Sequence, residues 1–304
     1  MLSSLFADRG IEFLKSVYMK DIVYYRIGGP ADFLVYPKTT EQLAFVTGTL
    51  NDNDVNYLIM GNGSNLLISD RGFRGCIIDM SKYFTNIVFD GEVCISAEAG
   101  CTMSSIQNYA EKLSLRGFEK LGGIPGTLGG ALVMNAGCYG TETGDLIKDV
   151  TVVSDGREEV IHASELNFKY RTSNLKGKIV LSARIQLEKG TKEDIAAERD
   201  RYSEIRRSKQ PLNYPSCGSV FKRPENCFAG ELIEKAGLKG KRYGGAQISD
   251  KHAGFIINTG TASSTDVLKL IQIAKEEVFR QFNVKLEEEV ILIGFDKGDG
   301  YENG

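Results

Sequence analysis

The sequence is short of the residues and patterns that build metal sites, membrane spans and export signals. It has only two histidines and six cysteines, and no two cysteines have C-x-x-C spacing, which argues against a structural zinc site. No apolar stretch is long enough to cross a bilayer, and the N-terminal residues lack the apolar core of a signal peptide. Scattered, unpaired cysteines are typical of a reducing compartment. We therefore expect a cytoplasmic protein with no metal centre and no membrane segment.

The sequence also lacks an excess of charge of either sign. Its 37 basic and 40 acidic residues give a formal net charge of −3, so nucleic acid is not an expected partner. With 42% hydrophobic and 25% charged residues over 304 positions, the composition is that of a soluble globular protein. A chain of this length predicts about two domains, or three small ones.

Glycine, in contrast, is concentrated in two short segments. Seven glycines fall between Gly122 and Gly140, and a second loop at residues 61–65 follows the apolar run 57–60, which is typical of a buried strand. Backbone N–H groups can hold a pyrophosphate only where side chains do not block them. Two such loops suit a dinucleotide, but from composition alone tight turns explain them equally well.

Neither glycine segment fits a common nucleotide-binding motif. The sequence Gly61-x-Gly63 continues to Leu66, so it does not complete G-x-G-x-x-G, and no lysine of a Walker A loop is present. A doubly wound nicotinamide-binding domain is therefore disfavoured.

Three polar residues in separate stretches are candidates for chemistry. Arg171 offers a fixed planar cation, Ser219 offers a hydroxyl beside Gly218, and Glu289 ends an acidic run inside an apolar segment. Each also has a structural interpretation, as a surface arginine, a turn serine and a solvated strand edge. His252 and Cys138 are more typical of a hydrogen-bonded structural residue and a packing residue.

The hydrophobic patterns predict an α+β protein with two lobes and a third lobe after about residue 195. Hairpins are expected at Asp90-Gly91 and Asp155-Gly156. The predicted helices are 40–51, one that begins at Thr102 and ends at Gly117, 192–209, 231–236 and 264–282. The predicted strands are 31–37, 56–60, 75–80, 86–89, 93–97, 150–154, 158–162, 179–187 and 284–293.

Seven ordered motifs together resemble the UDP-N-acetylenolpyruvoylglucosamine reductases, the flavoenzymes of muramic acid synthesis. They span nearly the whole chain, at residues 26–31, 61–67, 122–130 with 135–137, 170–171, 216–222, 247–258 and 286–290. The chain length resembles the shorter branch of that family, which lacks a tyrosine-bearing loop insert.

This resemblance implies an FAD-binding fold of the vanillyl-alcohol-oxidase type. Lobes at residues 1–80 and 81–194 would hold FAD without a covalent bond, and residues 195–304 would cover the substrate. Whether the last residues return to the FAD lobes stays open. The implied reaction uses NADPH to reduce the enolpyruvyl group of UDP-N-acetylglucosamine enolpyruvate, and we expect a monomer.

The resemblance also assigns residues. Arg171 would stabilise charge on the substrate carboxylate, Glu289 would orient or assist it, and Ser219 would donate the proton, with the thiol of Cys217 as the alternative acid. The expected contacts to substrate or nicotinamide are Tyr170, Lys222, Arg223, Gln247 and Lys251. The expected FAD contacts are Gly61, Asn62, Gly63, Ser64, Asn65, Leu66, Gly122, Gly123, Ile124, Pro125, Gly126, Thr127, Gly130, Asn135, Ala136 and Gly137.

Two rival interpretations remain at this stage. One is another flavin oxidase of the same fold, in which Cys138 could attach the flavin covalently. The other is a catalytically silent sugar-nucleotide-binding protein, which would need the glycine loops but not Arg171, Ser219 and Glu289 together.

Overall fold

The computed structural model describes residues 2–154 and 156–295, which form two compact units. Unit 1 comprises Met1–Leu14, Leu34–Asn62 and Cys76–Arg206, and unit 2 comprises Lys15–Phe33, Gly63–Gly75 and Arg207–Gly304. The two units therefore interleave along the sequence. The predicted division into three lobes stays a prediction.

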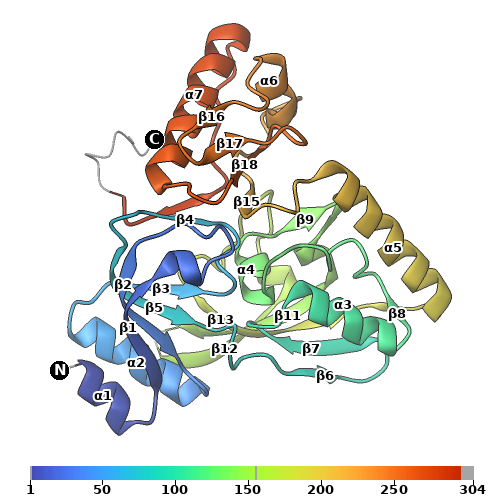
Figure 1. Ribbon diagram of the computed structural model, residues 1–304. Helices are drawn as coiled ribbons and strands as arrows, with labels where there is room; N and C mark the ends of the chain where they lie inside the picture. The colour runs from blue at the N-terminus through green and yellow to red at the C-terminus, as the bar shows by residue number, and fades with distance from the viewer. Residues whose placement is uncertain (1, 155, 296–304) are drawn as a thin grey trace. The chain divides into compact units, whose positions relative to one another are not determined.

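The core of unit 1 is a five-stranded sheet in the order β12-β11-β13-β7-β6 (Figure 1). Both predicted hairpins form, since β6 pairs with β7 and β11 pairs with β12 in antiparallel register. Of the second turn, Asp155 lies outside the described residues. The strands are β6 (Ile87–Phe89), β7 (Cys94–Glu98), β11 (Ile147–Ser154), β12 (Arg157–His162) and β13 (Ile179–Gln186).

Helices α3 (Met103–Lys112) and α4 (Leu128–Val133) bury their apolar residues against this sheet. Thr102 caps α3 as predicted, because its hydroxyl accepts the N–H of Ser105 at 3.0 Å. The predicted end at Gly117 is wrong. The helix stops at Lys112, and Ser114 takes the left-handed conformation with φ 55°.

A second sheet has the order β1-β2-β5-β3, and within it β3 and β5 run parallel. The strands are β1 (Glu12–Tyr18), β2 (Pro30–Tyr36), β3 (Tyr57–Met60) and β5 (Phe73–Asp79). Helix α2 (Thr40–Asp52) begins where predicted, with Thr39 accepting the N–H of Gln42 at 3.2 Å. Short elements complete this part of the chain: α1 (Leu2–Asp8), β8 (Leu115–Arg116) paired with β14 (Glu188–Lys189), and β9 (Gly137–Cys138) paired with β10 (Thr141–Glu142).

Unit 2 contains a four-stranded antiparallel sheet in the order β15-β18-β17-β16, with α6 and α7 packed on it. Ser263 and Asp266 form a capping box at the start of α7, and Asn283 ends that helix in the left-handed conformation. The elements are β15 (Ser216–Ser219), α6 (Ala229–Lys235), β16 (Arg242–Tyr243), β17 (Ala246–Ile248), β18 (Phe255–Asn258) and α7 (Ser264–Phe282).

The last strand of the chain differs from the prediction. The alternating pattern predicts a strand over residues 284–293, but only β19 (Ile291–Ile293) forms, and residue 288 makes one isolated bridge. Strand β19 pairs in parallel with β4 (Leu66–Ile68), directly after the first glycine loop.

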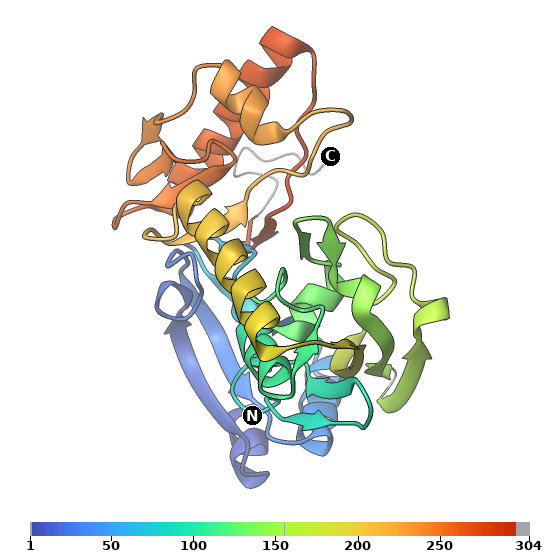
Figure 2. The same ribbon diagram turned by 90° about the vertical axis from the view of Figure 1, so that its right-hand side faces the viewer.

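The charged helix α5 (Lys192–Lys209) has the predicted bounds and buries only Ile195 (the gold helix in Figure 2). Its polar surface is held by ion pairs, such as Arg199 with Glu111 at 2.6 Å within unit 1. None of the helices in the described residues combines the length and the apolar character that a membrane span needs.

Candidate functional site

The two glycine loops meet in unit 1. A Cβ added at Gly61 would overlap the hydroxyl of Thr127 and lie 3.0 Å from Thr127 Cβ. Thr127 directly precedes α4, so the first loop passes against the start of that helix. Glycine at position 61 is therefore required by close approach of the two loops.

Backbone donors are left over in both loops. Among the described residues, the N–H groups of residues 61–65 have no hydrogen-bond acceptor, and the same holds for Gly123, Thr127 and Gly130. Buried or half-buried N–H groups normally have partners. Successive unpaired N–H groups in a turn that includes a left-handed residue, here Gly63 with φ 59°, make an anion-binding concavity. Taken by itself, each of these loops offers the open backbone donors that bind a phosphate.

Other glycines of the long run serve packing instead. A Cβ at Gly122 would overlap the Gln107 side chain, and one at Gly129 would lie 3.0 Å from the Cβ of Ala99. The structural interpretation of the glycine run is thus correct for these positions and, by its contact with Thr127, for Gly61 as well, while Gly63 is favoured by its positive φ of 59°.

Arg171 lies in a tight turn of unit 1. Lys169 and Thr172 exchange backbone hydrogen bonds of 3.0 and 3.1 Å, so Tyr170 and Arg171 form the corner. Arg171 has φ 56°, a conformation at which turns usually carry glycine. For a residue with a side chain this costs about 1 to 3 kcal/mol, and such strain clusters at functional sites.

The guanidinium of Arg171 is held on the loop at residues 135–137. Its Nη2 donates to the Gly137 carbonyl at 3.1 Å, and its Cζ lies 4.9 Å from the centre of the Tyr170 ring. Asn135, in the same loop, is fully buried and its Nδ2 donates to the Lys169 carbonyl at 3.2 Å. The structure therefore brings together the loop and the arginine that the sequence motifs pointed to.

A bulge in β15 separates Cys217 from Ser219 in unit 2. The pairing of β15 with β18 shifts register between Ser216 and Ser219, and Gly218 between them has φ 80°. Bulges with a left-handed glycine re-aim the side chains beside them. As a result Ser219 is exposed, whereas Cys217 is 4% exposed.

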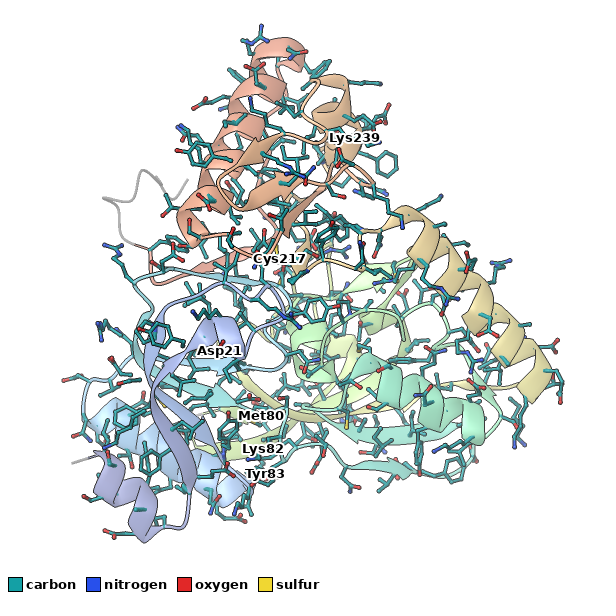
Figure 3. All side chains as sticks on the ribbon, viewed as in Figure 1. Asp21, Met80, Lys82, Tyr83, Cys217 and Lys239 are labelled. Atoms are coloured by element: carbon teal, nitrogen blue, oxygen red, sulfur yellow. The ribbon has the colours of Figure 1, made fainter. Side chains whose placement is uncertain are left out.

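The environment of Cys217 makes its thiol a poor acid. Burial raises the pKa of Cys217 to about 12, and the negative charge of Glu289 acts in the same direction. The residue packs beside Tyr25, whose hydroxyl donates to the Ile256 carbonyl at 2.9 Å (Cys217 is labelled in Figure 3). Three side chains in β15 could supply a proton; Ser216 and Cys217 are buried, and the hydroxyl of Ser219 is the accessible one.

Glu289 is fixed by its backbone to Val220, directly after β15, and to the first glycine loop. Its N–H donates to the Val220 carbonyl at 2.8 Å, and its carbonyl accepts Asn65 Nδ2 at 3.1 Å. Asn65 therefore links the predicted cofactor loop to the strand that carries Ser219. The two other glutamates of the run make ion pairs, Glu287 with Lys222 at 3.2 Å and Glu288 with Lys275 at 2.9 Å.

The residues expected to contact substrate have different surroundings. Gln247 is 5% exposed and its Nε2 donates to Asp250 at 2.7 Å, which indicates a structural contribution of that side chain. Lys251 donates to the Arg207 carbonyl, and the Arg223 guanidinium lies 4.3 Å from the centre of the Phe228 ring. Tyr170 is 46% exposed.

The motif at residues 247–258 ends in a residue whose supporting contacts the sequence does not reveal. Asn258 is buried, and its Nδ2 donates to the carbonyls of Tyr25 and Arg26 at 3.3 and 3.2 Å. Arg26 has φ 54°, so Asn258 fixes a strained turn against β18, the strand that pairs with β15. The motif at residues 26–31 was a signal for this turn, but its partner is over 200 positions away.

Comparison with known proteins agrees with this geometry. The family described as UDP-N-acetylenolpyruvoylglucosamine reductase, C-terminal domain, matches residues 210–293, and the FAD binding domain family matches residues 31–164. The UDP-N-acetylenolpyruvoylglucosamine reductase of Alkaliphilus oremlandii is 46% identical over 279 residues, which cover 91% of each chain. That of Caldicellulosiruptor bescii is 45% identical over 292 residues, which cover 94% of this chain and 92% of the relative.

A solved structure gives the same result. The crystal structure of the reductase from Thermus caldophilus matches with a TM-score of 0.80 at 34% identity, covering 93% of this chain and 98% of that one. These matches confirm the predicted α+β FAD-binding fold. The chain belongs to the UDP-N-acetylenolpyruvoylglucosamine reductase family.

Proposed function

We propose that this chain reduces the enolpyruvyl group of UDP-N-acetylglucosamine enolpyruvate, with NADPH as the hydride donor, to give UDP-N-acetylmuramate for peptidoglycan synthesis. The names and full-length coverage of the relatives support this activity, and the FAD binding domain match supports the cofactor. The observation that carries the proposal is the hydrogen bond from Asn65 to the Glu289 carbonyl. It ties the cofactor loop to the strand and carboxylate assigned to the chemistry.

The loops at residues 61–66 and 122–130 would hold FAD through their unpaired N–H groups. When bound, FAD supplies two-electron hydride chemistry, which no amino-acid side chain provides. The protein residues then have to bind the sugar nucleotide, hold its carboxylate and deliver one proton.

In the proposed mechanism, hydride adds to the outer carbon of the substrate alkene, and the electron pair of the double bond moves onto the inner carbon and its carboxylate. Arg171 stabilises that charge, because a guanidinium already fixed on Gly137 needs no reorganisation as the charge grows. The hydroxyl of Ser219 then donates its proton to the inner carbon, which completes the saturated product. Glu289 orients these groups.

Ser219 gives up one proton in each turnover, so that proton must be replaced from solvent before the next turnover. Its exposure on the bulge makes this replacement direct. Lys222, Arg223 and Lys251 in unit 2 and Tyr170 in unit 1 are the proposed contacts for substrate or nicotinamide. We also propose that the protein acts as a monomer in the cytoplasm, where sugar nucleotides and NADPH are available.

The test is an anaerobic two-step experiment. The protein is loaded with FAD, reduced with NADPH and then mixed with UDP-N-acetylglucosamine enolpyruvate while the flavin absorbance is followed. Reoxidation of the flavin with formation of UDP-N-acetylmuramate is the expected result. A flavin that stays reduced in the presence of this substrate would show that the proposed activity is wrong. Repeating the first step with NADH measures the preference for NADPH.

A flavin oxidase with a covalent cofactor is a weaker alternative. Cys138 is the cysteine nearest the FAD loop in sequence, but its Sγ donates to the Lys120 carbonyl at 2.9 Å and burial raises the pKa of its thiol. Both features disfavour a thiolate that attacks flavin. Flavin that remains on the chain after denaturation would revive this alternative.

A further inference from the structure

Within unit 1, the Arg171 turn is fastened to the segment that follows α4. Three hydrogen bonds, which we call the clamp, join residues 133–137 to residues 169–173: Ser173 Oγ to the Val133 carbonyl at 2.9 Å, Asn135 Nδ2 to the Lys169 carbonyl at 3.2 Å, and Arg171 Nη2 to the Gly137 carbonyl at 3.1 Å. The bonds therefore involve alternate residues of each segment, 133, 135 and 137 in one and 169, 171 and 173 in the other.

Asn135 is the centre of the clamp. Besides the Lys169 carbonyl, its Nδ2 donates to Glu142 Oε2 at 2.6 Å, and its Oδ1 accepts the Gly144 N–H at 2.9 Å. The side chain is fully buried, so its donors and its acceptor are all directed at protein groups. The hydrogen-bonding groups of this side chain are therefore already used within the protein and are not directed at a cofactor.

Backbone strain is concentrated in the clamp and directly beside it. Asn135, Tyr139 and Arg171 have φ of 42°, 55° and 56°, and they are three of the ten non-glycine residues with positive φ in the described part of the chain. Strained residues persist only where the surrounding contacts over-determine them. Here those contacts include the three clamp bonds. They also include the close packing of Gly144 against Phe168, where an added Cβ would lie 2.5 Å from the ring.

We propose that Asn135, supported by Glu142 and Ser173, is a positioning residue that holds Arg171 in its left-handed conformation against the loop at residues 135–137, and is not a direct contact of FAD. This inference rests on the proposed function in one respect, namely that Arg171 stabilises charge on the substrate. The clamp fixes the guanidinium to the same segment that continues from the cofactor loop, so the position of the charge is set before substrate arrives.

The central variant is Asn135→Asp, which has nearly the same shape but replaces the donor with a carboxylate that faces Glu142 and the Lys169 carbonyl. Amide hydrogen exchange of Lys169 and Thr172, measured by NMR, reports the turn directly because these two amides bond across it. We expect exchange there to become at least about tenfold faster, and flavin reoxidation by substrate to slow by about tenfold or more. The dissociation constant for FAD should change by less than about twofold.

Rescue distinguishes positioning from general damage. Adding Glu142→Gln to Asn135→Asp restores a donor–acceptor pair between residues 135 and 142 but not the bond to the Lys169 carbonyl, so it should recover only part of the slow exchange of Lys169 and Thr172. Ser173→Ala removes the clamp bond to Val133, together with the bond that the hydroxyl accepts from the Leu175 N–H at 3.3 Å, and tests the proposal if Asn135→Asp does not fold. Its matched control is Ser105→Ala in α3, which also loses a hydroxyl bonded to a backbone carbonyl, here at 2.7 Å from Thr102. We expect the amides of Lys169 and Thr172 to exchange faster in Ser173→Ala and to exchange at the wild-type rate in Ser105→Ala.

Two results would overturn the inference. One is unchanged exchange of Lys169 and Thr172 in Asn135→Asp, and the other is a large loss of FAD affinity without any change in exchange, which would make Asn135 a cofactor contact. If the wild-type protein itself fails to transfer hydride to the enolpyruvyl substrate, the proposed function is wrong, but the exchange measurements still decide whether the clamp exists.

Discussion

The turn that carries Arg171 in unit 1 and the bulge that carries Ser219 in unit 2 each contain one residue in the left-handed conformation. In the turn, that residue is Arg171 itself, with φ 56°. In the bulge it is Gly218, with φ 80°, and the functional side chain is its neighbour. The turn therefore places its functional group on the strained residue, and the bulge keeps the two apart.

This difference determines what each region needs for support. A glycine adopts positive φ without steric cost, so the bulge is held by the ordinary ladder between β15 and β18, where Ser219 faces Phe255. An arginine at positive φ is strained, and the clamp of three side-chain hydrogen bonds opposes its relaxation. The result is a guanidinium with a defined orientation, because hydrogen bonds hold both the turn that carries Arg171 and its Nη2.

The largest expected effect separates the two candidate acids of β15. Ser219→Ala should lower the rate of flavin reoxidation by substrate by about 1,000-fold, since general acid catalysis contributes about 10² to 10⁴. Reduction of the flavin by NADPH should stay near the wild-type rate. The matched variant Cys217→Ala should keep reoxidation within about threefold, because the thiol is buried and its pKa is raised. The reverse pattern in stopped-flow kinetics would transfer the role of acid to Cys217.

A smaller loss is expected at the turn. Arg171→Ala should slow reoxidation by about 10² to 10³, the range seen when one preorganised donor is removed from a developing negative charge. Arg171→Lys keeps the charge but lacks the planar fork that bonds Gly137, so it should recover only part of the rate. Equal activity of the lysine variant and the wild type would show that charge alone suffices and that the clamp does not matter.

Much of the framework could be predicted from sequence because its signals are local. Helices α5 and α7 match the predicted ranges, and α7 has its capping box in four consecutive residues. Helix α4 was missed because Gly129 and Gly130 are poor helix formers, and it forms through burial of Leu128 and Leu132 in the core of unit 1. Residues 284–290 alternate like a strand, but only residue 288 finds a bridge partner.

The site was harder to predict because its decisive contacts are distant in sequence. Alternation along β15 cannot assign Cys217 and Ser219 to faces, since the bulge at Gly218 changes the phase between them. Asn135 fits a predicted glycine-rich cofactor segment, yet its partner Lys169 is 34 positions away. The motifs identified the correct segments, and only the folded chain shows which side chains hold the others in place.

A third experiment measures the strain itself. Arg171→Gly and Arg171→Ala lose the same side-chain contacts, so their difference in unfolding free energy reports the left-handed backbone, and the glycine variant should be more stable by about 1 kcal/mol. Gly218→Ala should cost a similar amount, because no atom lies within 4 Å of the added Cβ. Gly91→Ala, in a hairpin with φ 81° and an equally open Cβ position, is the control for strain without function. If Gly218→Ala slows flavin reoxidation no more than Gly91→Ala does, the bulge does not set the orientation of the Ser219 side chain.

The smallest expected effect is a pH dependence of stability that is confined to the bulge. Burial lowers the pKa of His252 below the usual value of 6.5, with a further contribution from Lys239 (Figure 3), while Glu234 opposes the shift. The neutral ring accepts the Gly254 N–H on Nδ1 at 3.1 Å, and Gly254 in turn accepts the N–H of Val220, next to Ser219.

Because the folded state holds His252 neutral, the unfolded chain binds the proton first as the pH falls. The stabilisation is therefore complete above the ordinary histidine pKa and declines below it. Urea unfolding between about pH 7.5 and about pH 5 should show a steeper loss of stability for the wild type than for His252→Gln, with His162→Gln as the control for the other histidine. Relative to the intrinsic exchange rate, which slows as the pH falls, protection of the β15 amides should decrease over the same range while Lys169 and Thr172 keep their protection, since the clamp contains no histidine. An equal decrease of protection in both regions would mean that they do not respond separately, and the contrast between turn and bulge would be lost.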